Sequence, residues 1–226
     1  MEEGEWSKTL LLKQRLRGHP LYEEPYGRER IGKFAGRRII ARDTPINGGV
    51  YLGSGQREAI VIDDQKYPQE LNHAYQRLRR KMEQEKGSGK SIFNYVNEVA
   101  KEALGGSQNQ ADVEKKVDQL VESLTKKYGP DTKVTLNSFI REGAGYCRHR
   151  SLLSGYLIER LVKEGVLKGK VSIDRNYLPD RGGHAWVRWK GERRNQVIII
   201  DPSLNYVGRI ENAPKIWNYK RPSARR

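Results

Sequence analysis

The sequence predicts an α+β fold, because segments with helical character and segments with strand character occupy separate parts of the chain. Apolar residues recur at helical spacing between residues 68 and 128 and again after Arg148. Runs rich in Val, Ile and Trp, which are typical of strands, follow His184. We therefore expect a helix that packs on an antiparallel sheet, preceded by an N-terminal extension.

The chain divides into three predicted parts. Residues 1–66 form an extension with short strands, residues 67–218 the main domain, and residues 219–226 a basic C-terminal tail. The apolar runs of the extension, each expected to be strand, lie at residues 33–41, 50–52 and 59–62. The helices expected in the first half of the main domain span residues 68–86, 91–104 and 111–128.

The stretch from Gly87 to Ser91 imitates the end of a phosphate-binding loop. Such a loop needs a glycine at the position of Gln84 and an apolar strand before it, whereas a polar helix end precedes this one. We interpret it as a linker in which Ser91 caps the next helix.

A further helix follows the only cysteine, Cys147. Apolar residues at spacings of three and four, from Leu152 to Leu161, predict one buried face, and Gly165 is a suitable C-terminal stop. Cys147 then stands at the helix N-terminus, where free N–H groups and the helix dipole lower a thiol pKa. The same N–H groups are placed to hold an oxyanion.

Two strands expected at residues 184–190 and 196–201 carry a histidine and an aspartate at their outer ends. A hairpin with its loop from Gly191 to Arg194 pairs Lys190 with Asn195 and sets His184 directly opposite Asp201. Opposed residues share one face of a sheet. A thiol needs a neighbouring base, and the base needs a third group that fixes its tautomer. Cys147, His184 and Asp201 are thus the candidate catalytic residues.

A glycine-rich turn, a cysteine at a helix start, the strand Gly183-His184-Ala185-Trp186-Val187 and the pair Asp201-Pro202 resemble the transglutaminase-like superfamily of papain-like cysteine enzymes. The resemblance covers about residues 136–206. It implies a papain-like α+β core with Cys147 as nucleophile, His184 as base and Asp201 as orienting group. The chain departs from the usual pattern at residues 148–150, where Arg, His and Arg follow the cysteine.

Asn137 and Tyr146 are candidates for a side chain that stabilises the oxyanion, and Trp186, on the strand face of His184, for a wall of the cleft. His149 points about 200° away from Cys147 on the helix and is expected to be structural, hydrogen-bonded to a carboxylate. No zinc spacing signature is present. We expect no metal and no cofactor.

The predicted reaction is hydrolysis or transfer at an amide carbonyl of a protein or peptide. The alternative is an inactive protein of the same fold that binds a partner through its basic surface. The net charge is +15, and residues 141–226 carry 19 Lys or Arg against 8 Asp or Glu. This excess favours an acidic protein substrate over nucleic acid, because aromatic residues do not alternate with the basic ones.

The location expected for this chain is the cytoplasm. No apolar run approaches the ~20 residues of a membrane span, the first residues lack the pattern of a secretory signal, and a single cysteine excludes an internal disulfide.

Overall fold

The computed structural model describes residues 16–24, 31–53, 58–106, 108–129, 132–178, 180–193 and 195–221. Within these ranges the chain has an α+β fold with five α-helices and three sheets. In chain order the elements are β1 (Tyr22–Glu23), β2 (Lys33–Phe34), β3 (Arg37–Arg38), β4 (Val50–Leu52), β5 (Ala59–Val61), α2 (Gln69–Gln84), α3 (Ile92–Ala103), α4 (Gln110–Tyr128), β6 (Lys133–Thr135), α5 (Leu136–Glu142), α6 (Cys147–Lys163), β7 (Lys170–Leu178), β8 (Gly182–Lys190), β9 (Val197–Asp201), β10 (Tyr206–Arg209) and the 3₁₀ helix η1 (Ile210–Asn212).

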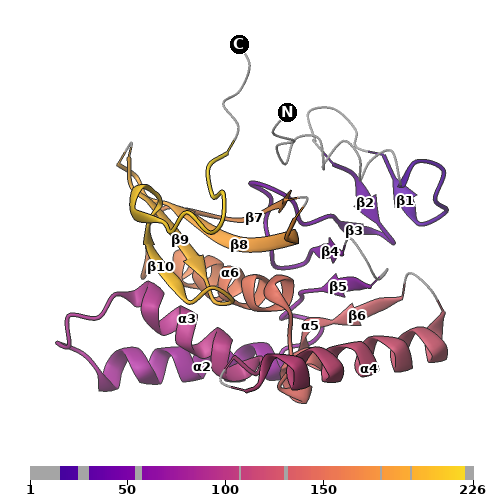
Figure 1. Ribbon diagram of the computed structural model, residues 1–226, viewed down its shortest axis with the longest axis horizontal. Helices are drawn as coiled ribbons and strands as arrows, with labels where there is room; N and C mark the ends of the chain where they lie inside the picture. The colour runs from indigo at the N-terminus through magenta and orange to yellow at the C-terminus, as the bar shows by residue number, and fades with distance from the viewer. Residues whose placement is uncertain are drawn as a thin grey trace, which may run out of the picture.

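The elements form layers (Figure 1). The largest sheet is antiparallel and has the strand order β10-β9-β8-β7. Helix α6 lies against one face of this sheet, and α2 and α3 cover the other side of α6. The helix that begins at the cysteine is therefore the central element of the molecule.

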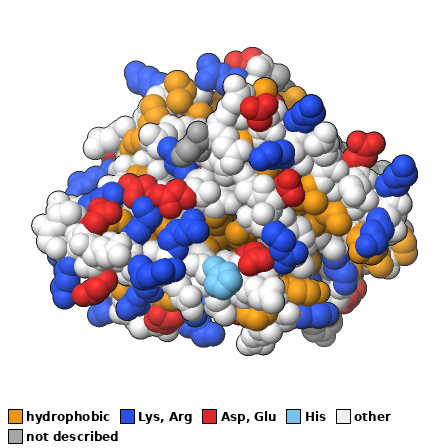
Figure 2. Space-filling view, turned by 90° about the horizontal axis from the view of Figure 1, so that it is seen from below, with side chains coloured by type: hydrophobic (Ala, Val, Ile, Leu, Met, Phe, Trp, Pro, Cys, Tyr) orange, Lys and Arg blue, Asp and Glu red, His pale blue; other side chains and the backbone are white. Residues whose placement is uncertain are grey.

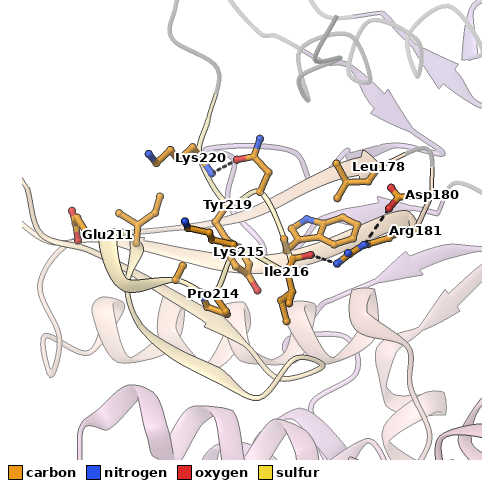
Figure 3. Close-up of a pocket in the computed structure, with 13 residues that line it drawn as sticks. Leu178, Asp180, Arg181, Glu211, Pro214, Lys215, Ile216, Tyr219 and Lys220 are labelled. Carbon is orange, nitrogen blue, oxygen red and sulfur yellow. Dashed lines mark hydrogen bonds and ion pairs between the residues drawn. The ribbon is translucent and has the colours of Figure 1, made fainter.

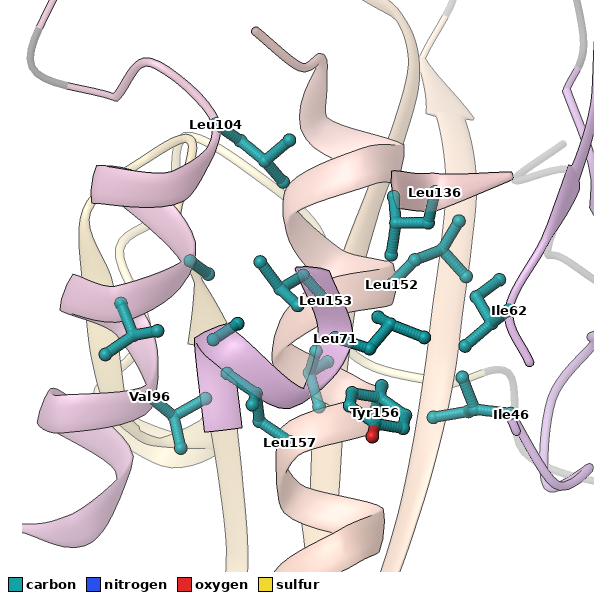
Figure 4. Packing of buried hydrophobic residues seen from close by; sticks show 14 of the residues in the cluster. Ile46, Ile62, Leu71, Val96, Leu104, Leu136, Leu152, Leu153, Tyr156 and Leu157 are labelled. Carbon is teal, nitrogen blue, oxygen red and sulfur yellow. The ribbon is translucent and has the colours of Figure 1, made fainter. Parts of the chain in front are cut away.

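The burial of α6 is more complete than its sequence predicts. Every residue from His149 to Ile158 is buried, so the expected single buried face is wrong for the first half of the helix. The reason is the position of α6 between two layers, where leucines on adjacent sides of the helix contact both (Figure 4). A small residue is needed where the layers approach closely: a Cβ on Gly155 would lie 2.5 Å from Ile173 Cδ1. The predicted end of the helix is confirmed, because α6 stops at Lys163 and Gly165 adopts a left-handed conformation (φ 74°).

The three helices predicted from periodicity are confirmed as α2, α3 and α4. Ser91 caps α3 as predicted, its hydroxyl accepting the Phe93 N–H at 3.2 Å. The run at residues 33–41 is not one strand, since Ala35 and Gly36 have positive φ and turn the chain between β2 and β3. The runs at residues 50–52 and 59–62 are found as β4 and β5.

Strand β7 has no counterpart in the sequence prediction, because polar residues occupy buried positions in it. Ser172 and Asp174 are both buried. Their partner is Arg221, which donates to the Asp174 carboxylate at 2.6 and 2.7 Å and to the Ser172 hydroxyl at 2.9 Å. Because Arg221 allows polar residues to be buried in β7, the strand lacks the alternation of apolar and polar residues that predicts a half-buried strand.

The predicted extension and the predicted main domain share a sheet. Strand β5 pairs in parallel with β6, and Ile46 and Ile62 pack into the same core as α6. At the other end of the chain, Tyr219 is buried and Arg221 is held by Asp174, so these residues of the predicted tail are part of the fold. Residues 222–226 lie outside the described ranges, as do residues 1–15.

None of the helices in the described ranges has the length and apolar character needed to cross a membrane. The face formed by α2, α3 and α4 carries Lys and Arg side chains interspersed with Asp and Glu (Figure 2). Lys81 pairs with Glu102 at 2.9 Å and Lys90 with Glu98 at 2.7 Å. This face is therefore mixed in charge rather than uniformly basic.

Candidate active site

The turn before α6 fixes the position of Cys147. Gly143 ends α5 in a left-handed conformation (φ 64°), which L side chains rarely adopt. Gly145 has no room for a side chain, because a Cβ there would lie 2.9 Å from the Cβ of His149. Tyr146 is the N-cap, and Cys147 is the first residue of the helix, as predicted.

The start of α6 provides free donors next to the thiol. The first intrahelical bonds are made by the N–H groups of His149 and Arg150, which both donate to the Tyr146 carbonyl. The N–H groups of Cys147 and Arg148 make no hydrogen bond to the described residues. Such groups at a helix N-terminus favour negative charge on a thiolate or on an oxyanion beside it.

His184 and Asp201 are brought together by the β8–β9 hairpin. His184 Nε2 lies 2.6 Å from Asp201 Oδ2, and the exposed fractions of the two side chains are 10% and 0%. Because Nε2 faces the carboxylate, the other ring nitrogen, Nδ1, remains for the thiol.

The register that brings them together differs from the predicted one. Lys190 pairs with Val197 rather than with Asn195, and Gly191 donates its N–H to the Gln196 carbonyl at 2.8 Å. Of the predicted loop, Arg194 lies outside the described residues. His184 is therefore not directly opposite Asp201, and the prediction was wrong by two residues. A shift of two leaves every side chain on its face, whereas a shift of one would have separated the pair.

The Asp201 carboxylate is fully hydrogen-bonded. Oδ1 accepts the backbone N–H groups of Ser203 and Leu204, each at 3.1 Å. Oδ2 accepts the Tyr219 hydroxyl at 2.8 Å as well as facing His184. Burial and the adjacent carboxylate raise the pKa of Tyr219, so it remains a neutral donor. Four partners hold the buried carboxylate in one orientation. Sequence reasoning did not identify Tyr219, because it lies in the predicted tail.

The backbone carbonyl and N–H of Ala185 on β8 hold the thiol next to its base. Ser151, one helical turn after Cys147, donates its hydroxyl to the Ala185 carbonyl at 2.8 Å and thereby ties α6 to β8. Burial raises the pKa of the Cys147 thiol, but the hydrogen bond to His184, the charge of that histidine and the N–H of Ala185 outweigh burial and lower it. Arg148 contributes in the same direction.

The pKa of His184 is displaced in the complementary direction. Burial lowers it, but hydrogen bonds to Asp201 and Cys147 and their negative charges raise it to about 9. A thiol with a lowered pKa next to an imidazole with a raised pKa is the signature of a thiolate and imidazolium pair.

Aromatic rings surround His184. Trp217 meets the imidazole edge-on, with ring centroids 4.8 Å apart and planes at 63°, and Trp186 lies 6.1 Å away on the same strand face. Trp186 has an exposed fraction of only 2% and packs on Tyr219, so it is a buried support of the histidine rather than a wall of an open cleft.

The two other candidates for oxyanion stabilisation are occupied elsewhere. The Asn137 amide donates to the Tyr67 carbonyl at 2.9 Å, and the Tyr146 hydroxyl donates to Asp118 Oδ1 at 2.7 Å. Neither prediction is supported by these contacts. The free N–H groups of Cys147 and Arg148 are the donors that remain.

The unusual residues after the cysteine have structural partners. Arg148 pairs with the buried Glu58 and lies over the Tyr146 ring, and Arg150 donates to the Leu104 carbonyl. His149 is buried, and its Nδ1 accepts the Tyr146 N–H at 3.0 Å, so the carboxylate partner expected for it is wrong. Burial lowers the pKa of His149 well below its usual value, which keeps it neutral.

Among the described residues, no group of three His, Cys, Asp or Glu side chains is arranged to hold a metal ion. No protein-family model matches the sequence, and neither the curated proteins nor the solved structures gave a match. What the site can do chemically therefore follows from its own geometry.

Proposed function

We propose that the chain is a cysteine-dependent acyltransferase or amidase with a papain-like core of the transglutaminase-like kind. The observation that carries the proposal is the contact of 2.6 Å between His184 Nε2 and the buried Asp201 carboxylate, which leaves Nδ1 for Cys147 at the start of α6. A nucleophile, a base and a group that orients the base are the parts that acyl transfer requires.

The proposed reaction begins with transfer of the Cys147 proton to His184. The thiolate attacks the carbonyl carbon of an amide, a C–S bond forms, and the negative charge moves to the carbonyl oxygen. The N–H groups of Cys147 and Arg148 stabilise that oxyanion. When the intermediate collapses, the C–N bond breaks and the amine leaves with the proton returned by His184. Water or a second amine then resolves the thioester.

Electrostatics support this order of events. The lowered pKa of Cys147 and the pKa of about 9 of His184 favour the charge-separated pair across neutral pH. Reactivity should fall in acid as the thiolate gains a proton, and above about pH 9 as the imidazolium loses the proton that the leaving amine needs.

An acidic protein or peptide is the substrate that the charge distribution favours. Residues 141–226, which contain the site, carry 19 Lys or Arg and 8 Asp or Glu. The face formed by α2, α3 and α4 is mixed in charge and offers no uniformly basic surface to a nucleic acid (Figure 2). The alternative function, binding without catalysis, would leave the charge-separated pair unused.

The proposal is tested by exposing the protein to a panel of acyl and peptidyl electrophiles and measuring intact mass. Because Cys147 is the only cysteine, each thioester or thioether adduct reports on one residue. Wild type should form stoichiometric adducts, Cys147→Ala none, and His184→Ala adducts only slowly. Absence of any adduct, together with tight nucleic-acid binding that Cys147→Ala leaves intact, would instead establish the binding function.

A further inference from the structure

A pocket of about 470 Å³ lies beside the candidate active site (Figure 3). One wall is the turn between β7 and β8, which contributes Leu178, Asp180 and Arg181. The opposite wall is the segment from Ile210 to Lys220. None of the steps proposed above uses this pocket.

The pocket and the active site share a wall. Trp217 lines the pocket and also meets the His184 imidazole edge-on at 4.8 Å. Tyr219 lines the pocket and donates its hydroxyl to Asp201. A ligand in the pocket would therefore lie one aromatic ring away from the base of the proposed reaction.

The lining combines apolar side chains with cations. Ile216 has an exposed fraction of 47%, which is high for a large apolar residue and is what a ligand would cover. Arg181 is held in place, because it donates to the Ile216 carbonyl at 2.5 Å and lies 3.3 Å from Asp180. It therefore contributes little free charge.

Two exposed lysines dominate the charge that remains. Among the described residues, no carboxylate lies within ion-pair distance of Lys215 or Lys220. Glu211, the other acidic residue of the lining, lies at the opposite end of the pocket from Arg181 (Figure 3). An anionic ligand would gain attraction from both lysines, whereas a cationic ligand would be repelled.

We propose that this pocket binds an acidic, partly apolar segment of the peptide whose carbonyl Cys147 attacks. The proposal rests on the proposed function, and it names the substrate class of the same site. Apolar side chains of the segment would cover Ile216 and Trp217, and its carboxylates would pair with Lys215 and Lys220.

The test is binding of two fluorescent peptides, one alternating Glu with Leu and the other Lys with Leu, to the Cys147→Ala protein by fluorescence polarisation. The acidic peptide should bind roughly tenfold more tightly than the basic one at low salt. In a Lys215→Glu, Lys220→Glu double variant this preference should disappear or reverse. A matched variant on α4, Lys115→Glu with Lys126→Glu, makes the same change in net charge and should keep the preference.

Three results would overturn the pocket as an acidic-peptide site. They are equal binding of the two peptides, an equal loss of affinity in the α4 variant, or preferential binding of an oligonucleotide that depends on Lys215 and Lys220. Failure of the proposed function would show differently, as a wild-type thiol that no acyl probe labels. The peptide measurement uses a protein without the thiol, so the two failures are distinguishable.

Discussion

Replacing Asp201 by Asn tests the link between the carboxylate and the thiol. The pKa of His184 is about 9, against about 6.5 for a free imidazole. That difference is equivalent to roughly 3 kcal/mol of preference for the imidazolium, which Asp201 and Cys147 share after the cost of burial. Asn removes the negative charge and presents His184 with a neutral amide, which also disturbs its tautomer.

The magnitude follows from how much of that preference Asp201 supplies. If Asp201 accounts for between half and all of it, the charge-separated pair becomes roughly 20- to 300-fold less populated. The charge of His184 then lowers the Cys147 pKa less, so burial, which raises that pKa, is offset less completely.

Iodoacetamide alkylation of the single cysteine, followed across pH, measures this change. Near pH 7 the Asp201→Asn variant should react more slowly by up to that factor, and the two proteins should react alike only above the Cys147 pKa of the variant, where both thiols are ionised. A thermal melt controls for loss of fold. Identical pH profiles in two proteins with equal melting temperatures would refute the proposed coupling of Asp201 to Cys147 through His184.

Three further predictions use the same contacts. Between about pH 6.5 and 8.5 the Cys147–His184 pair should add no pH dependence to the unfolding free energy of wild type, because the folded protein and the unfolded chain bind equal numbers of protons there. In Cys147→Ser the unfolding free energy should fall as pH rises through the folded His184 pKa. A flat profile in chemical denaturation would argue against a raised His184 pKa. Tyr219→Phe should lower the unfolding free energy by about 1–3 kcal/mol in the same assay, because Asp201 loses a hydrogen-bond donor. Alkylation of Cys147 below neutral pH should persist in this variant, and its loss would give Tyr219 a larger role. Arg221→Met should lower the unfolding free energy by about 3–5 kcal/mol, because it leaves the buried Asp174 carboxylate without its cation. Adding Asp174→Asn to that variant should recover part of the loss. A loss of less than about 1 kcal/mol would contradict the buried ion pair.

The helices and the start of α6 follow from the sequence because their signals are local. Apolar spacing defines α2, α3 and α4, and the glycines before Cys147 locate the nucleophile. Contacts between distant residues leave no such pattern. Arg221 pairs with Asp174, 47 residues away in the sequence, so β7 could not be predicted from its own residues. Tyr219 donates to Asp201 from a segment whose sequence is typical of a basic tail.

The hairpin shows the limit of register counting. The pair His184 and Asp201 was predicted from a loop two residues too short, and the resulting shift of two in the register preserved the shared face. Asn137 and Tyr146 were candidates for the side chain that stabilises the oxyanion, but hydrogen bonds to Tyr67 and Asp118 occupy them. The backbone N–H groups at the start of α6, by contrast, could be predicted as oxyanion donors, because the sequence indicates that the helix begins at Cys147.

The central claim is that Cys147 is a thiolate activated by His184 at neutral pH. Ultraviolet absorbance of the thiolate, titrated in wild type and in His184→Gln, measures this directly, since no other cysteine contributes. The account predicts a wild-type thiol that ionises well below the value of about 8.5 for a free cysteine, and a His184→Gln thiol that ionises at or above it. A wild-type titration at or above the free value, unchanged in His184→Gln, would contradict it.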